Sequence, residues 1–416
     1  MERAKIEEFN HWWIKGSVDT ELALPFKRDN YQEIESQVSK RFIIALIGLR
    51  RVGKTTSMYQ LIQKLLDEKI NATNILFFSF DENKVKLSEV IDIYKEIQKK
   101  DFREEKIYVF LDEIQKCSNW ENEIKKYYDL YPKIKFIISG SESLFIRKKT
   151  KETLAGRIFE FRLSSFAFRE YLRFKGVPQA DFKYETKVKP FFSSFIEKGG
   201  FPETFSFERD KDFKEYVRAL VVDKIVFKDI PSMFKIEYPE FLRVLLELIA
   251  TNPGMYIDYQ SLSKQFEKDR RVIKDYLIFL KESFLINILG NYRKGSMTTL
   301  RKKKRAYPSD NAISYLYKPK IEEGFIGRMV ETAAVNKLQA VSFWKNGNEI
   351  DIIHESMPIE VKYQEKIDNG DIKPVREFMR KFNVKKGTIV TKNEEREIKV
   401  EEGMITLIPA WKWVLR

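Results

Sequence analysis

The sequence contains very little cysteine and histidine. Among its 416 residues there is one cysteine, Cys117, and there are two histidines, His11 and His354. A single cysteine excludes an intramolecular disulfide and a four-cysteine zinc site, and two histidines exclude a histidine-rich metal site. Any metal chemistry of this chain therefore has to use carboxylate ligands.

Long apolar runs are also absent. No run approaches the roughly 18 residues that a membrane-spanning helix needs. The N-terminal stretch MERAKIEEFNHWW is too charged for a signal peptide. We therefore expect a cytoplasmic protein with no membrane partner.

Apolar and basic residues, by contrast, are plentiful. Hydrophobic residues make up 43% of the chain, and its length suggests two to four domains at about 100–200 residues each. Lysine and arginine number 76 against 62 aspartates and glutamates, which gives a net charge of +14. Such an excess favours nucleic acid or another polyanion as a partner, but a lysine-rich solvated surface gives the same count.

One motif points to phosphate binding. The stretch ALIGLRRVGKTTSMYQL, residues 45–61, fits the pattern G-x-x-x-x-G-K-[ST] between an apolar strand and a helix. Such a loop surrounds nucleotide phosphates with backbone N–H groups, while its lysine reaches the β- and γ-phosphates and its threonine holds Mg²⁺. We predict a nucleotide-binding loop, with Lys54 catalytic and Thr55 a metal ligand, that consists of Gly48, Leu49, Arg50, Arg51, Val52, Gly53, Lys54, Thr55 and Thr56.

From Arg41 onwards, apolar strands alternate with amphipathic helices, which predicts a parallel α/β sheet. The expected strands are 42–47, 75–80, 107–111, 136–139 and 158–163, with helices such as 54–68 and 120–131 between them.

Two acidic residues, Asp112 and Glu113, follow the third strand directly in IYVFLDEIQ. The carboxyl end of a buried parallel strand is where such sheets bind ligands. We expect Asp112 to hold Mg²⁺ and Glu113 to orient and polarise the attacking water. The alternative is that both simply begin a surface loop.

Further polar residues leave alternatives open. The fourth strand ends in Ser139-Gly-Ser141, where either serine could contact the γ-phosphate or the segment could simply form a turn. Arg157 precedes the fifth strand and could be catalytic by stabilising phosphoryl-transfer charge, in its own chain or across a subunit boundary. It is also one arginine among many on a basic surface.

After Phe166 the alternation stops, and the chain is predicted to be helical to about residue 240. Residues 261–266 and 269–283 then predict two helices around a short turn, followed by two strand-like runs. This is the layout of a winged helix, whose second helix can enter a DNA groove. Phosphate contacts would come from Arg270, Arg271 and Lys274 and from the run Arg301–Arg305. Alternatively, the module only braces the ATPase and these charges are solvated.

The C-terminal third contains a predicted helix at 324–338, which carries Glu331, and a hairpin in NGNEIDIIHESMPIEVKYQ. The hairpin brings Asp351 near Glu360 and Lys362, whose two-residue spacing puts them on one strand face. Two carboxylates and a lysine could bind Mg²⁺ and activate water against a phosphodiester. The same periodicity fits charged residues that merely face water.

The motifs GLRRVGKTT, VFLDEIQ, ISGSES, LAGR, GGFPE and IEVK, in this order, resemble a known family. They are similar to the predicted AAA-type ATPases of archaea and bacteria, whose P-loop domain is joined to a winged helix and a C-terminal domain of unknown function. The resemblance spans nearly the whole chain and implies ATP hydrolysis more directly than it implies a substrate.

The C-terminal ExD…(I)EVK pattern resembles, in addition, the PD-(D/E)xK nuclease fold. This resemblance implies that Asp351, Glu360 and Lys362 are the catalytic residues that hold a metal, Mg²⁺ or Mn²⁺, and activate water. Asp351 and Glu360 would be the metal ligands, and Glu331 would be the acid of the first helix.

Together these patterns predict an α/β protein with a P-loop NTPase sheet, a helical and winged-helix region, and a nuclease-like α/β domain. The expected regions are a P-loop ATPase domain with a helical lead-in at 1–165, a helical connection at 166–240, a winged helix at 241–318 and a nuclease-like domain at 319–416. The predicted function is Mg²⁺-dependent ATP hydrolysis by a protein that binds and remodels or processes DNA, with a possible nuclease site. The alternative is an ATP-driven switch or chaperone-like ATPase that acts on a protein partner through its C-terminal modules. The oligomeric state stays open.

Overall fold

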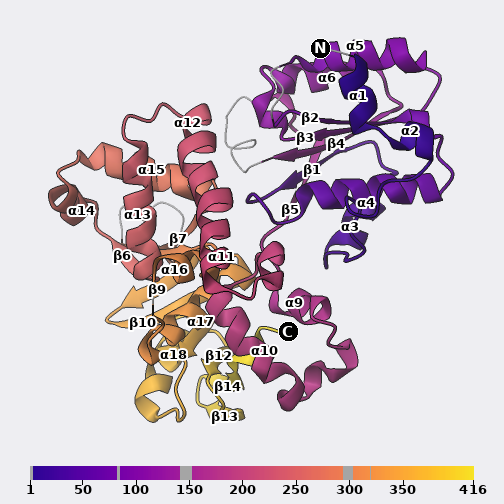
Figure 1. Cartoon of the computed structure of the whole chain (residues 1–416). Helices are drawn as coiled ribbons and strands as arrows, with labels where there is room; N and C mark the ends of the chain where they lie inside the picture. The colour runs from indigo at the N-terminus through magenta and orange to yellow at the C-terminus, as the bar shows by residue number, and fades with distance from the viewer. Residues whose placement is uncertain (1–2, 82–84, 141–151, 294–302, 319) are drawn as a thin grey trace. The chain divides into compact units, whose positions relative to one another are not determined.

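The computed structural model describes residues 3–81, 85–140, 152–293, 303–318 and 320–416. Ser141, Arg301 and Lys302, which were named above, lie outside these ranges. The chain divides into two compact units, Met1–Ser164 and Ser165–Arg416, which we describe one at a time (Figure 1). Within the described ranges, no helix is long and apolar enough to cross a membrane.

The first unit is built on a five-stranded sheet in the order β2-β3-β4-β1-β5, in which all neighbours are parallel. Its strands are β1 (Ile43–Ile47), β2 (Ile75–Ser79), β3 (Ile107–Asp112), β4 (Ile134–Gly140) and β5 (Ile158–Arg162). β1, β3 and β4 are buried throughout, as expected for strands covered on both faces. The predicted parallel α/β sheet is therefore confirmed.

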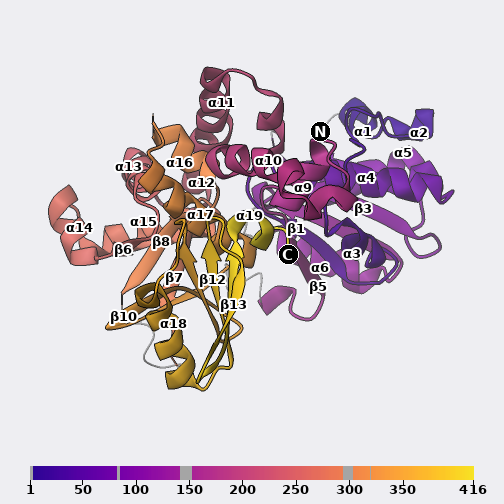
Figure 2. The same cartoon turned by 90° about the horizontal axis from the view of Figure 1, so that it is seen from below.

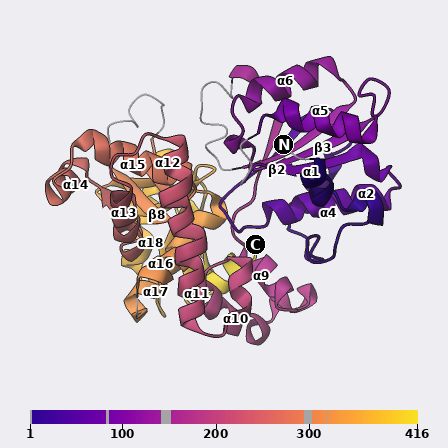
Figure 3. The ribbon, with the colours of Figure 1, turned by 45° about the horizontal axis from the view of Figure 1, so that its top comes forward.

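Helices cover both faces of this sheet. They are α1 (Arg3–Phe9), α2 (Trp12–Lys15), α3 (Tyr31–Ser36), α4 (Lys54–Asp67), α5 (Leu87–Gln98) and α6 (Trp120–Leu130), with short turns η1 (Ala72–Asn74) and η2 (Ile114–Lys116). The helix α4 lies on one face, and α5 and α6 lie on the other (Figures 1 and 3). This arrangement follows from right-handed crossovers, because the chain moves across the sheet in one direction after β1 and in the opposite direction after β2.

The helical lead-in protects the edge strand β2. The Asn10 side chain donates to the carbonyl of Phe77 at 2.9 Å and accepts from its N–H at 2.6 Å. The indole N–H groups of Trp12 and Trp13 both donate to the carbonyl of Ile75. These contacts occupy backbone groups of Ile75 and Phe77 and so hinder the pairing of another strand with this part of the edge.

The second unit begins with a helical region and continues into a mixed sheet. Its helical segments up to residue 282 are α9 (Phe168–Phe174), η3 (Gln179–Lys183), α10 (Glu185–Lys198), η4 (Pro202–Ser206), α11 (Asp210–Tyr216), η5 (Val217–Val222), η6 (Ile225–Asp229), α12 (Ile230–Met233), α13 (Pro239–Thr251), α14 (Tyr259–Phe266) and α15 (Arg270–Glu282). The later helices are α16 (Asn311–Tyr317), α17 (Glu323–Leu338), α18 (Asn369–Phe382) and α19 (Ala410–Trp413).

The strands of this unit form one nine-stranded sheet in the order β13-β14-β12-β11-β10-β9-β7-β8-β6. They are β6 (Met255–Ile257), β7 (Ile286–Asn291), β8 (Lys304–Pro308), β9 (Ser342–Asn346), β10 (Asn348–His354), β11 (Met357–Lys362), β12 (Lys386–Thr391), β13 (Arg396–Val400) and β14 (Gly403–Pro409). β7 pairs with β9 through Gly290–Ser342 and Asn291–Phe343. Strands from the regions 241–318 and 319–416 are therefore parts of a single sheet.

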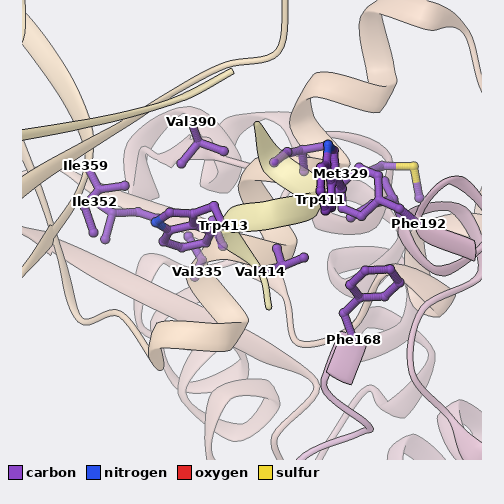
Figure 4. Close-up of a cluster of buried hydrophobic side chains, with 14 of the residues drawn as sticks. Phe168, Phe192, Met329, Val335, Ile352, Ile359, Val390, Trp411, Trp413 and Val414 are labelled. Carbon is purple, nitrogen blue, oxygen red and sulfur yellow. The ribbon is translucent and has the colours of Figure 1, made fainter. Parts of the chain in front are cut away.

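Two hydrophobic clusters lie on this sheet. The larger joins α9 and α10 to α17 and α19, and Figure 4 shows Phe168 and Phe192 gathered with Met329, Trp411 and Val414. The smaller packs α18 (Figure 2) against residues of β9, β10, β12 and β14. One large core thus contains residues from the beginning of the second unit, Phe168, to its end, Val414.

The GGFPE motif has a structural explanation. Asp310 is buried, caps α16 through the N–H of Ala312 at 2.7 Å, and accepts from the N–H of Gly200 at 3.1 Å and from the hydroxyl of Ser165. A Cβ at Gly199, where φ is +74°, would lie 1.9 Å from Asp310 Oδ1. Glycine is required because the loop packs directly on this carboxylate.

Candidate nucleotide site and C-terminal carboxylate cluster

The predicted phosphate loop lies between β1 and α4, at the carboxyl edge of the first sheet. A Cβ at Gly48 would lie 2.0 Å from the carbonyl oxygen of Leu163, so a larger residue would displace the end of β5. Gly53 has φ +92° directly before α4, a conformation that favours glycine. Both glycines of the motif are therefore needed to form the loop.

Lys54 lies inside this loop. Its ammonium donates to the carbonyls of Gly48 at 3.0 Å and Leu49 at 2.8 Å, and lies 3.9 Å from Glu113 Oε1. Only 5% of its side chain is exposed. The positive charge is thus held within the turn where the motif predicts that nucleotide phosphates bind.

Asp112 lies beside Thr55, as the sequence predicts. The Thr55 hydroxyl donates to Asp112 Oδ2 at 2.9 Å, and the Ser139 hydroxyl donates to the other carboxylate oxygen. Burial and the neighbouring Glu113 raise the pKa of Asp112, against the effects of Ser139, Lys54 and Thr55. One hydroxyl and one carboxylate are oxygen ligands of the kind that Mg²⁺ takes together with substrate phosphates, so these residues fit the predicted ion.

Glu113 is held in place by groups around it. Its backbone has φ +50°, a conformation that costs a non-glycine residue about 1–2 kcal/mol. Its N–H donates to Ser139 Oγ at 3.1 Å, and the Gln115 amide donates to its carboxylate. Its carboxylate therefore faces Lys54 and Gln115. Sequence reasoning missed Gln115, because no motif position marks it.

An ion-pair group lies beside the loop at the same sheet edge. Arg50 and Lys116 both pair with Asp81, Arg50 at 3.3 Å. Burial raises the pKa of Asp81, but Lys116 and Arg50 lower it by more, and the net pKa is lowered. Asp81 and Lys116 were not predicted, because only strand order brings them to Arg50.

Arg157 is not brought to this site. It precedes β5 and pairs with Asp129 at 3.2 Å. The next residue, Ile158, is in register with Ile43 at the start of β1, whereas the phosphate loop follows the end of β1. Within its own unit, Arg157 therefore lies where the strands begin, and Lys54 lies at the opposite end, where the strands finish.

The C-terminal hairpin brings together the residues that were predicted there. The Asp351 N–H donates to Glu360 Oε2 at 3.1 Å, and the Val361 N–H donates to Asp351 Oδ2 at 2.9 Å. Lys362 Nζ lies 3.0 Å from Glu360 Oε1. The pairing register of β10 with β9 shifts between Ile350 and Ile353, the kind of irregularity that redirects side chains.

Arg305 of β8 adds a cation that the sequence did not predict there. Its guanidinium pairs with Glu331 Oε1 at 2.7 Å, Asp351 Oδ1 at 3.0 Å and Glu349 Oε1 at 3.3 Å. We call Arg305, Glu331, Glu349, Asp351, Glu360 and Lys362 the carboxylate cluster. The expectation that Arg305 contacts DNA phosphates is wrong, because its side chain is 9% exposed and already paired.

Burial shifts the proton affinities in this cluster. Burial and Asp351 raise the pKa of Glu331 to about 8, although Arg305 and Tyr307 oppose the shift. Burial and Asp351 also raise the pKa of Glu360. Burial lowers the pKa of Lys362, but Glu360, Asp351 and Asp371 together raise it by more, and the net pKa is raised. The carboxyl groups of Glu331 and Glu360 therefore hold a proton more tightly than exposed carboxyl groups do.

The residues of the cluster do not fit a divalent ion. Asp351 and Glu360, the two predicted metal ligands, are already paired with cations of the chain, Asp351 with Arg305 and Glu360 with Lys362, whereas Asp112 accepts from neutral hydroxyls. Across the part of the chain that the structure describes, no group of three or more histidine, cysteine or acidic residues could hold a metal.

The basic residues of α15 lie where the sequence predicts. Arg270, Arg271 and Lys274 are exposed, while Ile273 and Tyr276 are buried on the other side of the helix. The elements run α13, β6, α14, α15, β7 and β8, and β8 pairs antiparallel with both β6 and β7. The helix α15 therefore presents three cations to solvent.

Comparison with known proteins identifies part of the first unit. Residues 40–172 match the family model of the AAA domain. The first unit thus carries an AAA-type P-loop domain. Residues 190–318 match a domain of unknown function.

Relatives that match over much of the chain are described as uncharacterized proteins. The chain is 23% identical to the uncharacterized protein MJ1544 of Methanocaldococcus jannaschii, over 92% of this chain and 90% of the relative. It is 25% identical to an uncharacterized protein of Haemophilus influenzae, over 69% of this chain and 72% of the relative. A DNA polymerase III gamma subunit-related protein from Thermotoga maritima matches at 11% identity, over 61% of this chain and 100% of that chain, with a TM-score of 0.29. A TM-score this low says nothing about function.

Proposed function

We propose that the protein is a Mg²⁺-dependent ATPase. The observation that carries this proposal is the convergence of Lys54, Thr55 and Asp112 at one sheet edge, with Glu113 only 3.9 Å from the Lys54 ammonium. The AAA domain match of residues 40–172 supports the same activity. Phosphoryl transfer needs mainly positioning and charge stabilisation, which this group of residues can supply.

Each residue has a distinct role in this proposal. Lys54 stabilises negative charge on the phosphates, and the backbone N–H groups of the loop bind them. Glu113 orients and polarises the attacking water, and Ser139 positions the Asp112 carboxylate and the backbone of Glu113. Thr55 and Asp112 would hold Mg²⁺, which neutralises charge on the phosphate oxygens when it is bound.

Two variants and one control test this activity. Lys54→Ala should abolish ATP hydrolysis, and Glu113→Gln should bind nucleotide without turnover, each lowering the rate on the order of 10³-fold or more. Lys64→Ala is the matched control, because Lys64 lies on the same helix, but 38% of its side chain is exposed and it pairs with Glu35 at 3.4 Å. Undiminished hydrolysis by purified Lys54→Ala would overturn the proposal.

DNA is the substrate class that we propose for this ATPase. The order of α13, β6, α14, α15, β7 and β8 is that of a winged helix, whose second helix can contact DNA. The exposed cations of α15 and the net charge of +14 support an anionic partner. An acidic protein partner would use the same charge, and it remains the alternative.

The rate of ATP hydrolysis with different nucleic acids separates these two functions. Single-stranded, duplex and branched DNA should each be added at low salt, and one form should stimulate turnover if DNA is the substrate. No stimulation and no binding of any form would favour the protein partner.

Metal-dependent nuclease activity with Mn²⁺ is not part of this proposal. The nuclease-like order of α17, β9, β10, β11, α18 and β12 supports the predicted resemblance. The pairing of Asp351 with the Arg305 guanidinium and of Glu360 with the Lys362 ammonium does not support a metal there.

A further inference from the structure

The guanidinium of Arg305 occupies the centre of the carboxylate cluster. Its two terminal nitrogens contact three carboxylates from two elements: Glu331 from α17, and Glu349 and Asp351 from β10. Glu331 also accepts from the hydroxyl of Tyr307 at 2.5 Å. A single cation thus bridges the side chains that a divalent ion would have to bring together.

The backbone around Arg305 is formed to hold it. Its Nε donates to the carbonyl of Gly254 at 2.8 Å. A Cβ at Gly254, where φ is +79°, would lie 2.6 Å from the second terminal nitrogen of Arg305. Only glycine leaves room for the guanidinium here, so Gly254 and β8 together fix the position of the charge.

Aromatic rings complete the enclosure. The guanidinium carbon lies 5.3 Å from the ring centroid of Tyr307 and 5.9 Å from that of Phe343. Burial alone would lower the pKa of Arg305, but Glu331, Tyr307 and Asp351 raise it by more. Arg305 therefore keeps its charge in this position.

The charges of the cluster are close to balance without any added ion. Arg305 and Lys362 lie against Glu331, Asp351 and Glu360, and Lys345 pairs with Glu349 at 2.7 Å. Three cations thus face four carboxyl groups. A divalent ion would add two charges next to a fixed guanidinium and an ammonium, which is electrostatically unfavourable.

We propose that Arg305 is the resident cation of the carboxylate cluster, in the place that a divalent metal would need. The cluster then binds a guanidinium from its own chain and takes no Mg²⁺ or Mn²⁺. The ion pairs of Arg305 connect β8 to β10 and α17. The nuclease-like region then binds no metal ion of its own. This inference does not depend on the proposed ATPase activity.

Binding of Mn²⁺ to the protein without nucleotide, followed by electron paramagnetic resonance of the free ion, tests this proposal. The wild type and Asp351→Asn should bind Mn²⁺ equally, because Asp351 is not a ligand. Arg305→Gln should bind about one more Mn²⁺ per chain, since freed carboxylates favour this ion. The double variant Arg305→Gln/Asp351→Asn should lose that extra ion.

Arg305→Lys is the matched control, because it keeps a cation at this position and should gain no Mn²⁺. Circular dichroism of each variant checks that it is folded. Either of two results would overturn the proposal: more Mn²⁺ bound by the wild type than by Asp351→Asn, or no extra Mn²⁺ in folded Arg305→Gln. If Arg305→Gln does not fold, the comparison of the wild type with Asp351→Asn still decides.

Discussion

Ser139 connects the two acidic residues that end β3. It is fully buried, donates to Asp112 and accepts from the N–H of Glu113 at 3.1 Å. A side chain that orients a ligand or a catalytic group in this way usually contributes 10–100-fold to affinity or activity. The sequence left open whether this serine contacts the γ-phosphate or simply forms a turn. In the structure Ser139 belongs to β4, and its hydroxyl group contacts Asp112 and Glu113.

We expect Ser139→Ala to lower kcat by roughly 10–100-fold while nucleotide affinity changes little, because the phosphate loop does not contain this residue. Steady-state kinetics and binding of a fluorescent nucleotide measure the two quantities separately. Ser139→Cys, which has a similar size and a weaker donor, should be intermediate. A proportional loss of affinity and kcat would instead indicate a general disturbance of the first unit.

Cys117, the only cysteine of the chain, is buried after β3. Burial raises the pKa of this thiol to about 11. The folded protein therefore holds the proton more tightly than the unfolded chain does, so this contribution to stability is complete below the ordinary thiol pKa and is lost as pH rises through about 11.

We expect Cys117 to resist iodoacetamide at pH 8 in the native protein, because only the thiolate reacts. In 6 M guanidinium chloride it should react completely, and mass spectrometry counts the modified chains. Native labelling at the rate of a free thiol would show that the segment after β3 opens readily.

At both sites the residues that could be predicted are those fixed by local spacing. Lys54 and Thr55 follow from the loop motif, and Asp112 and Glu113 follow from the strand before them. Gln115 and Arg305 could not be found in this way. Arg305 reads as part of a basic run, and its burial depends on the pairing of β8 with β6 and β7 and on a carboxylate from α17.

At the scale of the elements, helices and strands with a clear period were predictable. The predicted helices 261–266 and 269–283 agree with α14 and α15 to within two residues at each end. Asp258 and Asp269 cap these helices by accepting from backbone N–H groups, a local signal. The pairing of β7 with β9 was not predictable, because only two residue pairs make it and they lie about 50 positions apart.

The basic face of α15 gives a prediction at this scale. If Arg270 and Arg271 contact DNA phosphates, changing both to Ala should weaken binding and flatten the dependence of log K on log salt by about one to two units. Fluorescence anisotropy over a salt series measures this slope. Binding that ignores both salt and these changes would favour the protein partner.

The control for this experiment comes from another helix of the same unit. Lys373 and Arg380 of α18 are also exposed, and changing both removes the same charge from the chain. The α15 proposal requires that Lys373→Ala/Arg380→Ala keep the original slope. Equal flattening by both pairs would mean that net charge, and not α15, governs binding.

At the scale of the molecule, the two compact units divide the chain at Ser164–Ser165. Each has its own sheet, and the second sheet continues through the region where a boundary between a winged helix and a nuclease-like domain was expected, at 318–319. Domains are expected to fold alone when few contacts cross their boundary. The position of a cut should therefore decide whether a fragment folds.

We expect residues 165–416 to fold when expressed alone and residues 319–416 not to fold. The larger cluster of the second unit includes eight buried residues that precede position 319, namely Phe168, Tyr171, Leu172, Val188, Phe192, Ile196, Leu289 and Tyr307. Each contributes about 1.5–3 kcal/mol by burial, so their combined contribution is at least comparable to the roughly 5–15 kcal/mol by which a domain is stable. Removing Arg305 would also leave Glu331 and Asp351 without their cation.

Thermal unfolding followed by circular dichroism checks both fragments, and the full chain gives the reference transition. Residues 165–416 should show one cooperative transition, because one sheet and one large core connect their parts. A cooperative transition in residues 319–416 would contradict the expectation. It would show that the core formed by α17, α18 and β9–β14 suffices on its own, and that the shared sheet and Arg305 only join two independent domains.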